Sequence, residues 1–178
     1  PKIGVLNLHG GKLPNYRGSS PINWALINGE KIITISILKM TEEIDAGEIL
    51  AEKSLKISDN DTAKNVLDWA LKKFPTLLYK TLINIQTHKK IVGKKQSKDN
   101  INYYPLRSPN DGFINFEVMK LQNILNLIRA LTPPFPGAFG VLNNRKIFLL
   151  EAKRLSVKFS GIPGKIYLVR GYGLIIMA

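Results

Sequence analysis

The amino-acid sequence predicts an α/β domain followed by a smaller, β-rich domain. In the first part, apolar runs of strand length alternate with stretches whose apolar residues recur every three or four positions, as in helices. In the last part, two pairs of short apolar runs flank the turn sequences NNR and RGYG, which favours two hairpins. The composition changes near Leu106, so we expect domains over residues 1–105 and 106–178.

The elements of the first domain follow from the residue pattern. The continuous apolar run IGVLNL, residues 3–8, predicts a strand buried on both faces of a parallel sheet. Ser20 as N-cap and Pro21 as first helical residue are expected to begin a short helix. Residues 31–40, KIITISILKM, alternate apolar and polar side chains like a half-buried strand, and residues 46–57 predict the next strand.

A long helix is expected to follow these strands. Asp61 is a candidate N-cap, and Pro75 should kink the helix or divide it in two. Another amphipathic helix is expected over residues 121–131 and should stop at TPPFPG. The apolar face of the long helix would be formed by Leu67, Leu71, Phe74, Leu78, Leu82 and Ile85.

The formal net charge is +13, and much of it lies in one stretch. Eight lysines and no acidic residue occur between Lys72 and Lys98. Such a stretch forms either a solvated helix end and loop or an anion- or RNA-facing patch. The absence of cysteine excludes disulfides and thiolate metal sites, and the two histidines lie far apart in the sequence, which argues against a histidine metal site. No apolar run is long enough to span a membrane. These features favour a cytoplasmic protein without a metal.

One of the two histidines stands at the end of the first strand. Asn7 and His9 are two positions apart and would therefore project to the same side of it. An amide can stabilise a developing oxyanion while an imidazole moves a proton, a combination suited to carbonyl chemistry. Asp45, in EEIDAGEI, is a candidate partner for the imidazole. The alternatives are that the pair only satisfies backbone groups of the loop and that Asp45 is a turn residue before glycine.

The sequence resembles the 10-formyltetrahydrofolate-dependent formyltransferases. The matching segments are NLHGGKLPNYRG, IDAGEI with Asp45 36 residues after His9, RSPNDGFINF and NLIRALTPPFPGAFG. The resemblance implies a Rossmann-like formyltransferase domain, of which this chain would lack the first half, and a truncated OB-like domain at the C-terminus. We therefore expect the chain to be a piece of a longer enzyme.

The resemblance also implies site residues and a reaction. His9 would be the acid/base, Asn7 would stabilise the oxyanion, and Asp45 would hold His9 and favour its protonated form. The co-substrate would be 10-formyltetrahydrofolate, with no metal. Lys12 departs from the family pattern, which has a Ser-Leu pair where this chain has Gly11 and Lys12. Folate contacts are expected, largely through backbone, along Gly11, Lys12, Leu13, Pro14, Thr41, Glu42, Glu43 and Ile44.

The resemblance leaves the amine acceptor open between two branches of the family. NYRGSSPINWALINGE is more similar to the branch that formylates nucleotide-linked amino sugars, whereas the charge of +13 favours the methionyl-tRNA branch. Arg17, Lys12 or Arg107 would bind a pyrophosphate, and Tyr104 or Phe135 would stack on the base. A catalytically inactive binding module is the third interpretation, and it requires that Asn7, His9 and Asp45 lie apart. The expected partner is a small-molecule nucleotide sugar, with tRNA as the alternative and no membrane. The sequence leaves a homo-oligomer open.

Overall fold

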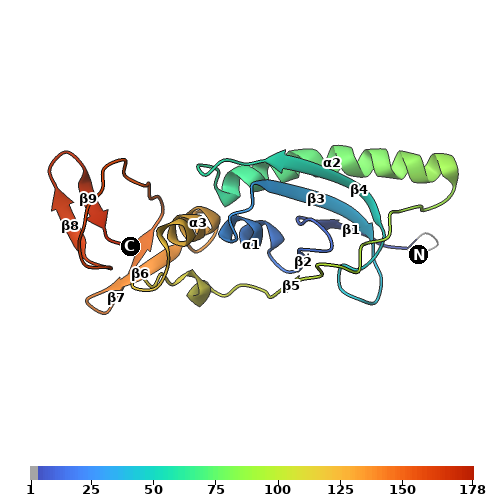
Figure 1. Cartoon of the computed structure of the whole chain (residues 1–178). Helices are drawn as coiled ribbons and strands as arrows, with labels where there is room; N and C mark the ends of the chain where they lie inside the picture. The colour runs from blue at the N-terminus through green and yellow to red at the C-terminus, as the bar shows by residue number, and fades with distance from the viewer. Residues whose placement is uncertain (1–3) are drawn as a thin grey trace. The chain divides into compact units, whose positions relative to one another are not determined.

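The computed structural model describes residues 4–178, and the chain divides into two compact units, Pro1–Arg107 and Ser108–Ala178. The first unit combines helices with a sheet, and the second combines helical turns with hairpins, as Figure 1 shows. The expected α/β domain followed by a β-rich domain is confirmed. Within residues 4–178, no helix has both the length and the apolar character needed to cross a membrane.

The sheet of the first unit has the strand order β1-β3-β4, formed by Leu6–His9, Ile32–Lys39 and Ile49–Lys56. Both pairings are antiparallel, so the expected parallel arrangement is wrong for the described strands. Leu8 is 41% exposed, and β1 is not buried on both faces; residue 3 of the expected strand lies outside the described residues. A continuous apolar run indicates a strand but carries no information on the direction of its neighbour.

Strand β3 is the central strand, and it is buried on both faces rather than half-buried. Its residues from Ile33 to Leu38 are all buried, including the polar ones. The Thr34 hydroxyl lies 2.9 Å from the Ser54 hydroxyl, and the Ser36 hydroxyl donates to the Gly11 carbonyl oxygen at 2.9 Å. These hydrogen bonds explain why the alternating pattern was misleading: its polar positions are satisfied inside the protein.

Short elements link the sheet to the loops that carry the site. Helix α1 (Pro21–Ile27) begins after Ser20, as expected, but Ser20 has φ 54° and its side chain makes no capping hydrogen bond. Strand β2 (Arg17–Gly18) pairs in parallel with β5 (Tyr103–Tyr104). This pairing brings the segment after the long helix back to the segment that follows His9.

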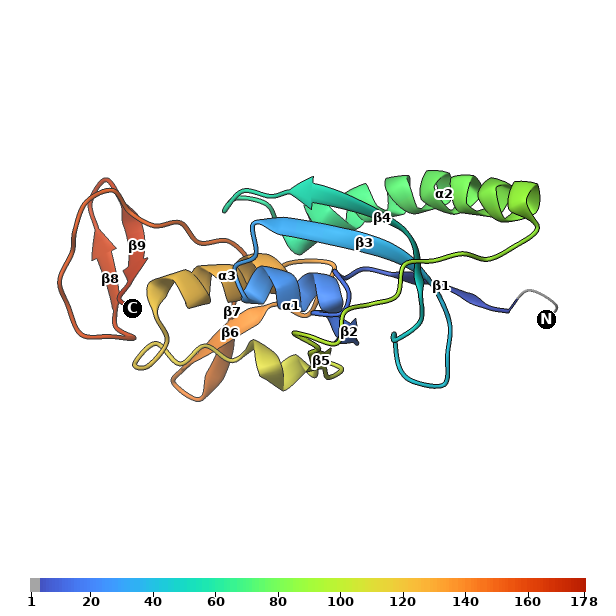
Figure 2. The same ribbon diagram turned by 45° about the vertical axis from the view of Figure 1, so that its right-hand side comes forward.

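Helix α2 (Ala63–His88) packs against β3 and β4, and Figure 2 shows it running along these strands. It also contacts α1. Thr62, rather than Asp61, is its N-cap, with a reciprocal capping box to Asn65, because Asp61 accepts hydrogen bonds from Ser58 instead. The helix continues through Pro75 and is not divided. Its buried positions are Ala63, Val66, Ala70 and Thr81.

The expected apolar face of α2 is therefore partly wrong. Leu71 is 62% exposed and Leu82 is 48% exposed, although both belong to the apolar series in the sequence. Small residues allow the helix to approach the sheet closely, so the face that packs is rotated away from the largest side chains.

The second unit contains η1 (Pro109–Gly112), α3 (Leu121–Leu131) and the hairpins β6 (Ala138–Leu142) with β7 (Arg145–Leu149) and β8 (Ile166–Val169) with β9 (Gly173–Ile176). Asn143 and Asn144 have φ 49° and 61°, the left-handed pair that a two-residue hairpin turn requires. Helix α3 and both expected hairpins are confirmed.

Candidate active site

Asn7, His9 and Asp45 come together at the end of β1. The Asn7 side-chain amide donates to Oδ1 of Asp45 at 2.9 Å, and Nδ1 of His9 lies 3.6 Å from Oδ2 of Asp45. Asn7 and His9 are alternate residues of one strand, whereas Asp45 reaches them from the loop between β3 and β4. The structure thus places the proposed acid/base, oxyanion donor and carboxylate within contact of one another.

The conformation of the loop aims the Asp45 carboxylate at this site. Asp45 has φ 49°, a left-handed conformation that aspartate tolerates better than most residues. Its Oδ2 accepts the backbone N–H of Gly18 at 2.8 Å, while Oδ1 accepts from Asn7. Both carboxylate oxygens are therefore fixed by donors, and Oδ2 is left facing the imidazole of His9.

His9 is buried, with only 5% of its surface exposed. Its Nε2 lies 2.5 Å from the backbone carbonyl oxygen of Tyr16. A carbonyl can only accept, so Nε2 carries the proton in this contact, and Nδ1 is the basic atom of the neutral ring. The basic ring atom of His9 is consequently the one that faces Asp45.

Arg17 is placed differently from the expectation that it binds a substrate phosphate. It is only 4% exposed. Its Nη1 donates to Oε1 of Glu43 at 2.9 Å and to the hydroxyl of Tyr103 at 2.7 Å, and its Nε and Nη2 both donate to Oε1 of Gln96. The guanidinium is thus engaged inside the first unit and is not presented to a ligand.

The same contacts affect Glu43. The Tyr103 hydroxyl donates to Oε1 of Glu43 at 2.7 Å. This hydrogen bond, and after it the nearby Arg17 guanidinium, hold the pKa of the Glu43 carboxyl below its usual value. Glu43 therefore stays ionised and anchors the loop that carries Asp45.

The segments expected to contact folate fall into three environments. Gly11 and Lys12 line a pocket beside the His9 loop, whereas the side chains of Leu13 and Pro14 are buried in the unit. Residues 41–44 form an exposed loop, and Ile44 is 63% exposed beside Asp45. Because their side chains are buried, Leu13 and Pro14 could contact a ligand only through their backbone groups.

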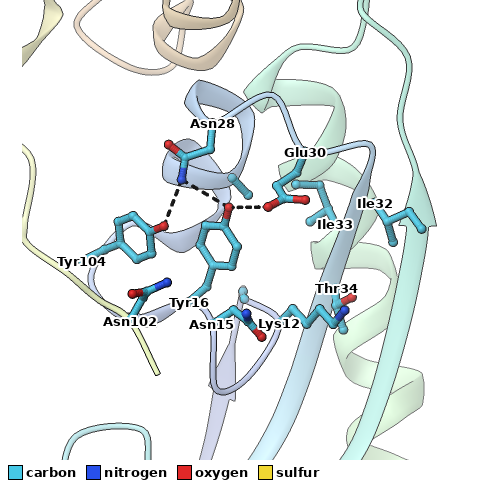
Figure 3. Close-up of a pocket in the computed structure, with 13 residues that line it drawn as sticks. Lys12, Asn15, Tyr16, Asn28, Glu30, Ile32, Ile33, Thr34, Asn102 and Tyr104 are labelled. Atoms are coloured by element: carbon cyan, nitrogen blue, oxygen red, sulfur yellow. Dashed lines mark hydrogen bonds between the residues drawn. The ribbon is translucent and has the colours of Figure 1, made fainter. Parts of the chain in front are cut away.

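The pocket that contains Lys12 is polar and has a volume of about 240 Å³ (Figure 3). Tyr16 and Tyr104 stack in it with ring centroids 4.9 Å apart. The Asn28 amide donates to both hydroxyls, and the Tyr16 hydroxyl donates to Glu30 at 2.8 Å. Burial raises the pKa of the Tyr16 phenol, and Glu30 raises it further.

A second hollow, of about 490 Å³, lies directly beside Asp45. Its lining includes Asp45, Ile44, the Gly18–Ser19 segment and Tyr104. Because Asp45 is one of its lining residues, it is the better candidate for the space in which the reacting groups would meet. The remaining lining residues are Tyr103, Pro105 and Leu106.

The other residues expected to bind the acceptor are positioned as follows. The Arg107 guanidinium lies 4.8 Å above the ring of Trp24, at the end of the segment that lines the second hollow. Phe135 belongs to the second unit and is partly exposed after α3, and its role stays a prediction. Among residues 4–178, no three histidine or carboxylate side chains are grouped closely enough to hold a metal ion.

Residues 1–82 match the Formyl transferase family, and residues 107–178 match the C-terminal domain of formyl transferases. The chain belongs to the 10-formyltetrahydrofolate-dependent formyltransferases. This formyltransferase chain is 42% identical, over 93% of its length, to the bifunctional polymyxin resistance protein ArnA of Wigglesworthia glossinidia brevipalpis. The chain spans 25% of the length of that relative.

Solved structures agree with the family. Methionyl-tRNA formyltransferase from Clostridium thermocellum has a TM-score of 0.69 and 25% identity, over 86% of this chain and 64% of that one. The N-formyltransferase from Helicobacter canadensis, solved with folinic acid and dTDP-3-aminofucose, has a TM-score of 0.73 and 23% identity, over 97% and 62%. The formyltransferase fold is therefore shared with proteins of both branches.

Sequence analysis missed the groups that hold the site in place. Gln96, the Tyr103 hydroxyl, the Gly18 N–H and the Tyr16 carbonyl all contact the site or its supports. Two are backbone groups and carry no side-chain signal. Gln96 and Tyr103 are far from Asp45 in sequence, so no local spacing could indicate them.

Proposed function

We propose that this chain is part of a cytoplasmic enzyme that transfers a formyl group from 10-formyltetrahydrofolate to the primary amine of a nucleotide-linked amino sugar. The observation that carries the proposal is the convergence of Asn7, His9 and Asp45, the last of which lines a hollow of about 490 Å³. The third interpretation, an inactive binding module, requires these residues to lie apart and so loses its support.

His9 supplies the proton transfer. As the amine nitrogen attacks the formyl carbon, it must lose a proton, and Nδ1 of His9 is the basic ring atom that faces the site. The resulting imidazolium lies next to the Asp45 carboxylate, which stabilises its charge. The same proton is then returned to the nitrogen that leaves the formyl carbon, so atoms and charge balance over the cycle.

Asn7 stabilises the oxyanion that develops on the formyl oxygen. Its amide nitrogen bears two hydrogens, and the contact with Asp45 uses one of them. The other can be donated to the reacting oxygen. Because Asp45 fixes the amide in advance, the donor needs no reorganisation when charge develops.

The formyl donor is expected beside Asp45. Folates carry a flat ring with an apolar face, and the exposed Ile44 side chain lines the hollow at this point. Residues 41–44 are exposed, and their backbone would contact the polar edge of the ring. These features fit the donor, whose formyl carbon is attacked by the amine with tetrahydrofolate as the leaving group.

An amino sugar acceptor is supported by the local sequence and by the groups near the second hollow. Tyr104 lines that hollow, and Arg107 directly follows the lining residue Leu106 in the sequence. A guanidinium suits phosphate oxygens and an aromatic ring suits a nucleobase. The Helicobacter canadensis relative was solved with a dTDP-linked amino sugar, which fits the same acceptor class.

Methionyl-tRNA is the second candidate acceptor. The charge of +13, the lysines from Lys72 to Lys98 and the similarity to a methionyl-tRNA formyltransferase favour it. Phosphate contacts of this kind make binding fall steeply with salt, by roughly 10³-fold or more between 50 and 200 mM for about six contacts.

The deciding experiment offers the intact protein a formyl donor labelled in the formyl group, with UDP- and dTDP-linked amino sugars in one series and methionyl-tRNA in another. We expect label in the sugar nucleotide. Label in tRNA alone, with a steep salt dependence, would establish the second candidate. Label in neither acceptor would refute the transfer reaction itself.

A further inference from the structure

Gln96 connects the lysine-rich loop after α2 to the turn that carries Asp45. Its side-chain amide donates to the carbonyl oxygen of Asp45 at 2.6 Å and to that of Gly47 at 2.8 Å. Its Oε1 accepts Nη2 of Arg17 at 3.0 Å and Nε at 3.2 Å. One half-buried side chain thus joins three separate segments of the first unit.

The chemistry of the partners fixes the orientation of the Gln96 amide. A guanidinium can only donate and a carbonyl can only accept, so the oxygen of Gln96 must face Arg17 and its nitrogen must face the turn. Both hydrogens of the nitrogen are used, one on each carbonyl. Such a saturated side chain holds its partners at defined positions.

The turn is held on its other side by the same arginine. Nη1 of Arg17 donates to Glu43, which precedes Asp45 by two residues. Arg17 therefore contacts Glu43 directly and reaches the backbone of Asp45 and Gly47 through Gln96. The segment from 43 to 47 is clamped at both ends around a residue with φ 49°.

We propose that Gln96 is a positioning residue that aims the Asp45 carboxylate at His9. The kinetic part of this proposal rests on the proposed formyl transfer, whereas its geometric part does not. Without the two hydrogen bonds, the left-handed turn keeps the Arg17–Glu43 contact on its other side. The Gly18 N–H and the Asn7 amide then hold the carboxylate without support of the backbone behind it, and Oδ2 can move away from Nδ1 of His9. A displacement of about 1 Å in a supporting group lowers turnover by up to about 100-fold.

The competing explanation is that Gln96 only fastens the lysine-rich loop to the body of the unit. The backbone of Lys94 already pairs with Ile49 at 2.8 and 2.9 Å, so the loop has an anchor of its own. A fastening role predicts a change in stability, and a positioning role predicts a change at Asp45.

The first test compares Gln96→Ala with Gln86→Ala, the same substitution at an exposed position of α2. Formyl transfer by the intact protein is measured with a nucleotide-linked amino sugar and with methionyl-tRNA. Gln96→Ala is expected to lower kcat by about 10- to 100-fold with KM within about twofold, and Gln86→Ala to leave both unchanged. An unchanged kcat in Gln96→Ala would overturn the proposal.

Gln96→Glu tests the acceptor role of the side chain separately from its donor role. It keeps the acceptors for Arg17 but loses the donors to the Asp45 and Gly47 carbonyls. Because positioning acts through those donors, Gln96→Glu should be as impaired as Gln96→Ala. Restoration of wild-type kcat by glutamate would show that only Arg17 needs a partner and would refute the role toward Asp45.

A double-mutant cycle with Asp45→Asn tests whether Gln96 acts through Asp45. If it does, adding Gln96→Ala to Asp45→Asn should change kcat by less than about twofold, because the group being aimed has lost its charge. If the two substitutions instead lower kcat independently, so that their fold-losses multiply in the double variant, the proposal is contradicted.

Hydrogen exchange of the Gly18 amide provides a readout that needs no activity. This N–H donates to Oδ2 of Asp45, whereas the next amide, Ser19, donates to the Tyr104 carbonyl. Gln96→Ala should speed exchange at Gly18 by about tenfold or more and leave Ser19 unchanged. Unchanged exchange at Gly18 would overturn the geometric part, even if the intact protein proved to transfer no formyl group and the proposed function failed.

Discussion

The backbone carbonyl oxygen of Tyr16 lies 2.5 Å from Nε2 of His9. A backbone acceptor cannot titrate, so this contact assigns the same tautomer to the neutral imidazole throughout the working pH range. The loop after β1 therefore does more than carry His9 to the site: its fold selects which ring nitrogen bears the proton and which one faces Asp45.

His9→Ala in the intact protein should abolish formyl transfer. It should also lower the free energy of unfolding by about 1–3 kcal/mol, because the Tyr16 carbonyl loses a buried donor. A stability cost is expected because His9 is buried, unlike a solvent-exposed loop histidine. Turnover and chemical denaturation check both results, with His88→Ala, at the exposed end of α2, as control. Substantial remaining turnover would exclude His9 as the acid/base.

Gly11→Ala should impair activity because the space beside His9 is full. A Cβ at Gly11 would lie 2.8 Å from Nε2 of His9, 2.8 Å from the Tyr16 carbonyl oxygen and 2.9 Å from Cβ of Pro21. We expect a destabilisation of about 1–3 kcal/mol and a lower kcat, measured by thermal unfolding and by formyl transfer.

Gly10→Ala is the matched control for Gly11→Ala. Its new Cβ would meet only the side chain of Ile22 and Pro21, at 3.1 Å or more, and the Ile22 side chain can move. Equal losses in the two variants would show that the loop backbone, rather than the packing against His9, is responsible.

Glu43 should make stability depend on pH in the acid range. The pKa of its carboxyl is held below the usual value by Tyr103 and Arg17, so the folded state binds a proton less readily than the unfolded state. The stabilisation is therefore present above about pH 4.3, the ordinary glutamate value, and is lost as the pH falls through the lower value in the folded protein.

Glu43→Gln should remove this contribution. The variant is expected to be less stable than wild type at pH 7, with the difference shrinking as the pH falls below about 4. Urea denaturation of both proteins at several pH values measures it. A difference that stays constant down to pH 2.5 would mean that the charge of Glu43 does not stabilise the loop.

Arg107 and the lysine run should separate the two acceptors. If a sugar nucleotide is bound, Arg107→Ala should raise its KM by about tenfold through a lost charge-assisted hydrogen bond to phosphate. Replacing Lys89, Lys90, Lys95 and Lys98 with glutamine should leave that KM unchanged. The reverse pattern, with weaker methionyl-tRNA binding and a smaller salt slope in the lysine variant, would support tRNA as the acceptor.

Local sequence signals predicted most elements of this fold. The spacing around residues 121–131 predicted α3, and the Asn143–Asn144 pair predicted the turn of the first C-terminal hairpin. The direction of β1 was not predictable, because pairing is decided by the neighbouring strand and not by the run itself. The face of α2 was misjudged because the sheet packs on Ala63, Val66 and Ala70, small residues that a pattern of large apolar side chains overlooks.

The candidate site also contains residues that the sequence indicated and residues that it did not. Asn7, His9 and Asp45 could be named from the sequence because their chemistry and spacing resemble a known family. The sequence did not indicate the contacts that Arg17 makes inside the first unit. An arginine near a site is as well suited to neutralising buried partners as to binding phosphate, and its sequence position cannot distinguish the two. The partners that decide it, Gln96 and Tyr103, become neighbours only when β5 pairs with β2.

The backbone pairing of Lys94 with Ile49 also divides the loop after α2 into two parts with different tolerance to engineering. Between Lys89 and Val92, added residues would only lengthen a surface excursion, and a peptide tag or a dye-labelled cysteine could be introduced there at little loss of folding. From Gly93 to Gln96 a single inserted residue would shift the register between this loop and the turn of Asp45. Sites for immobilising or labelling the protein are therefore available within seven residues of the support of its candidate active site, provided that they are placed before Gly93.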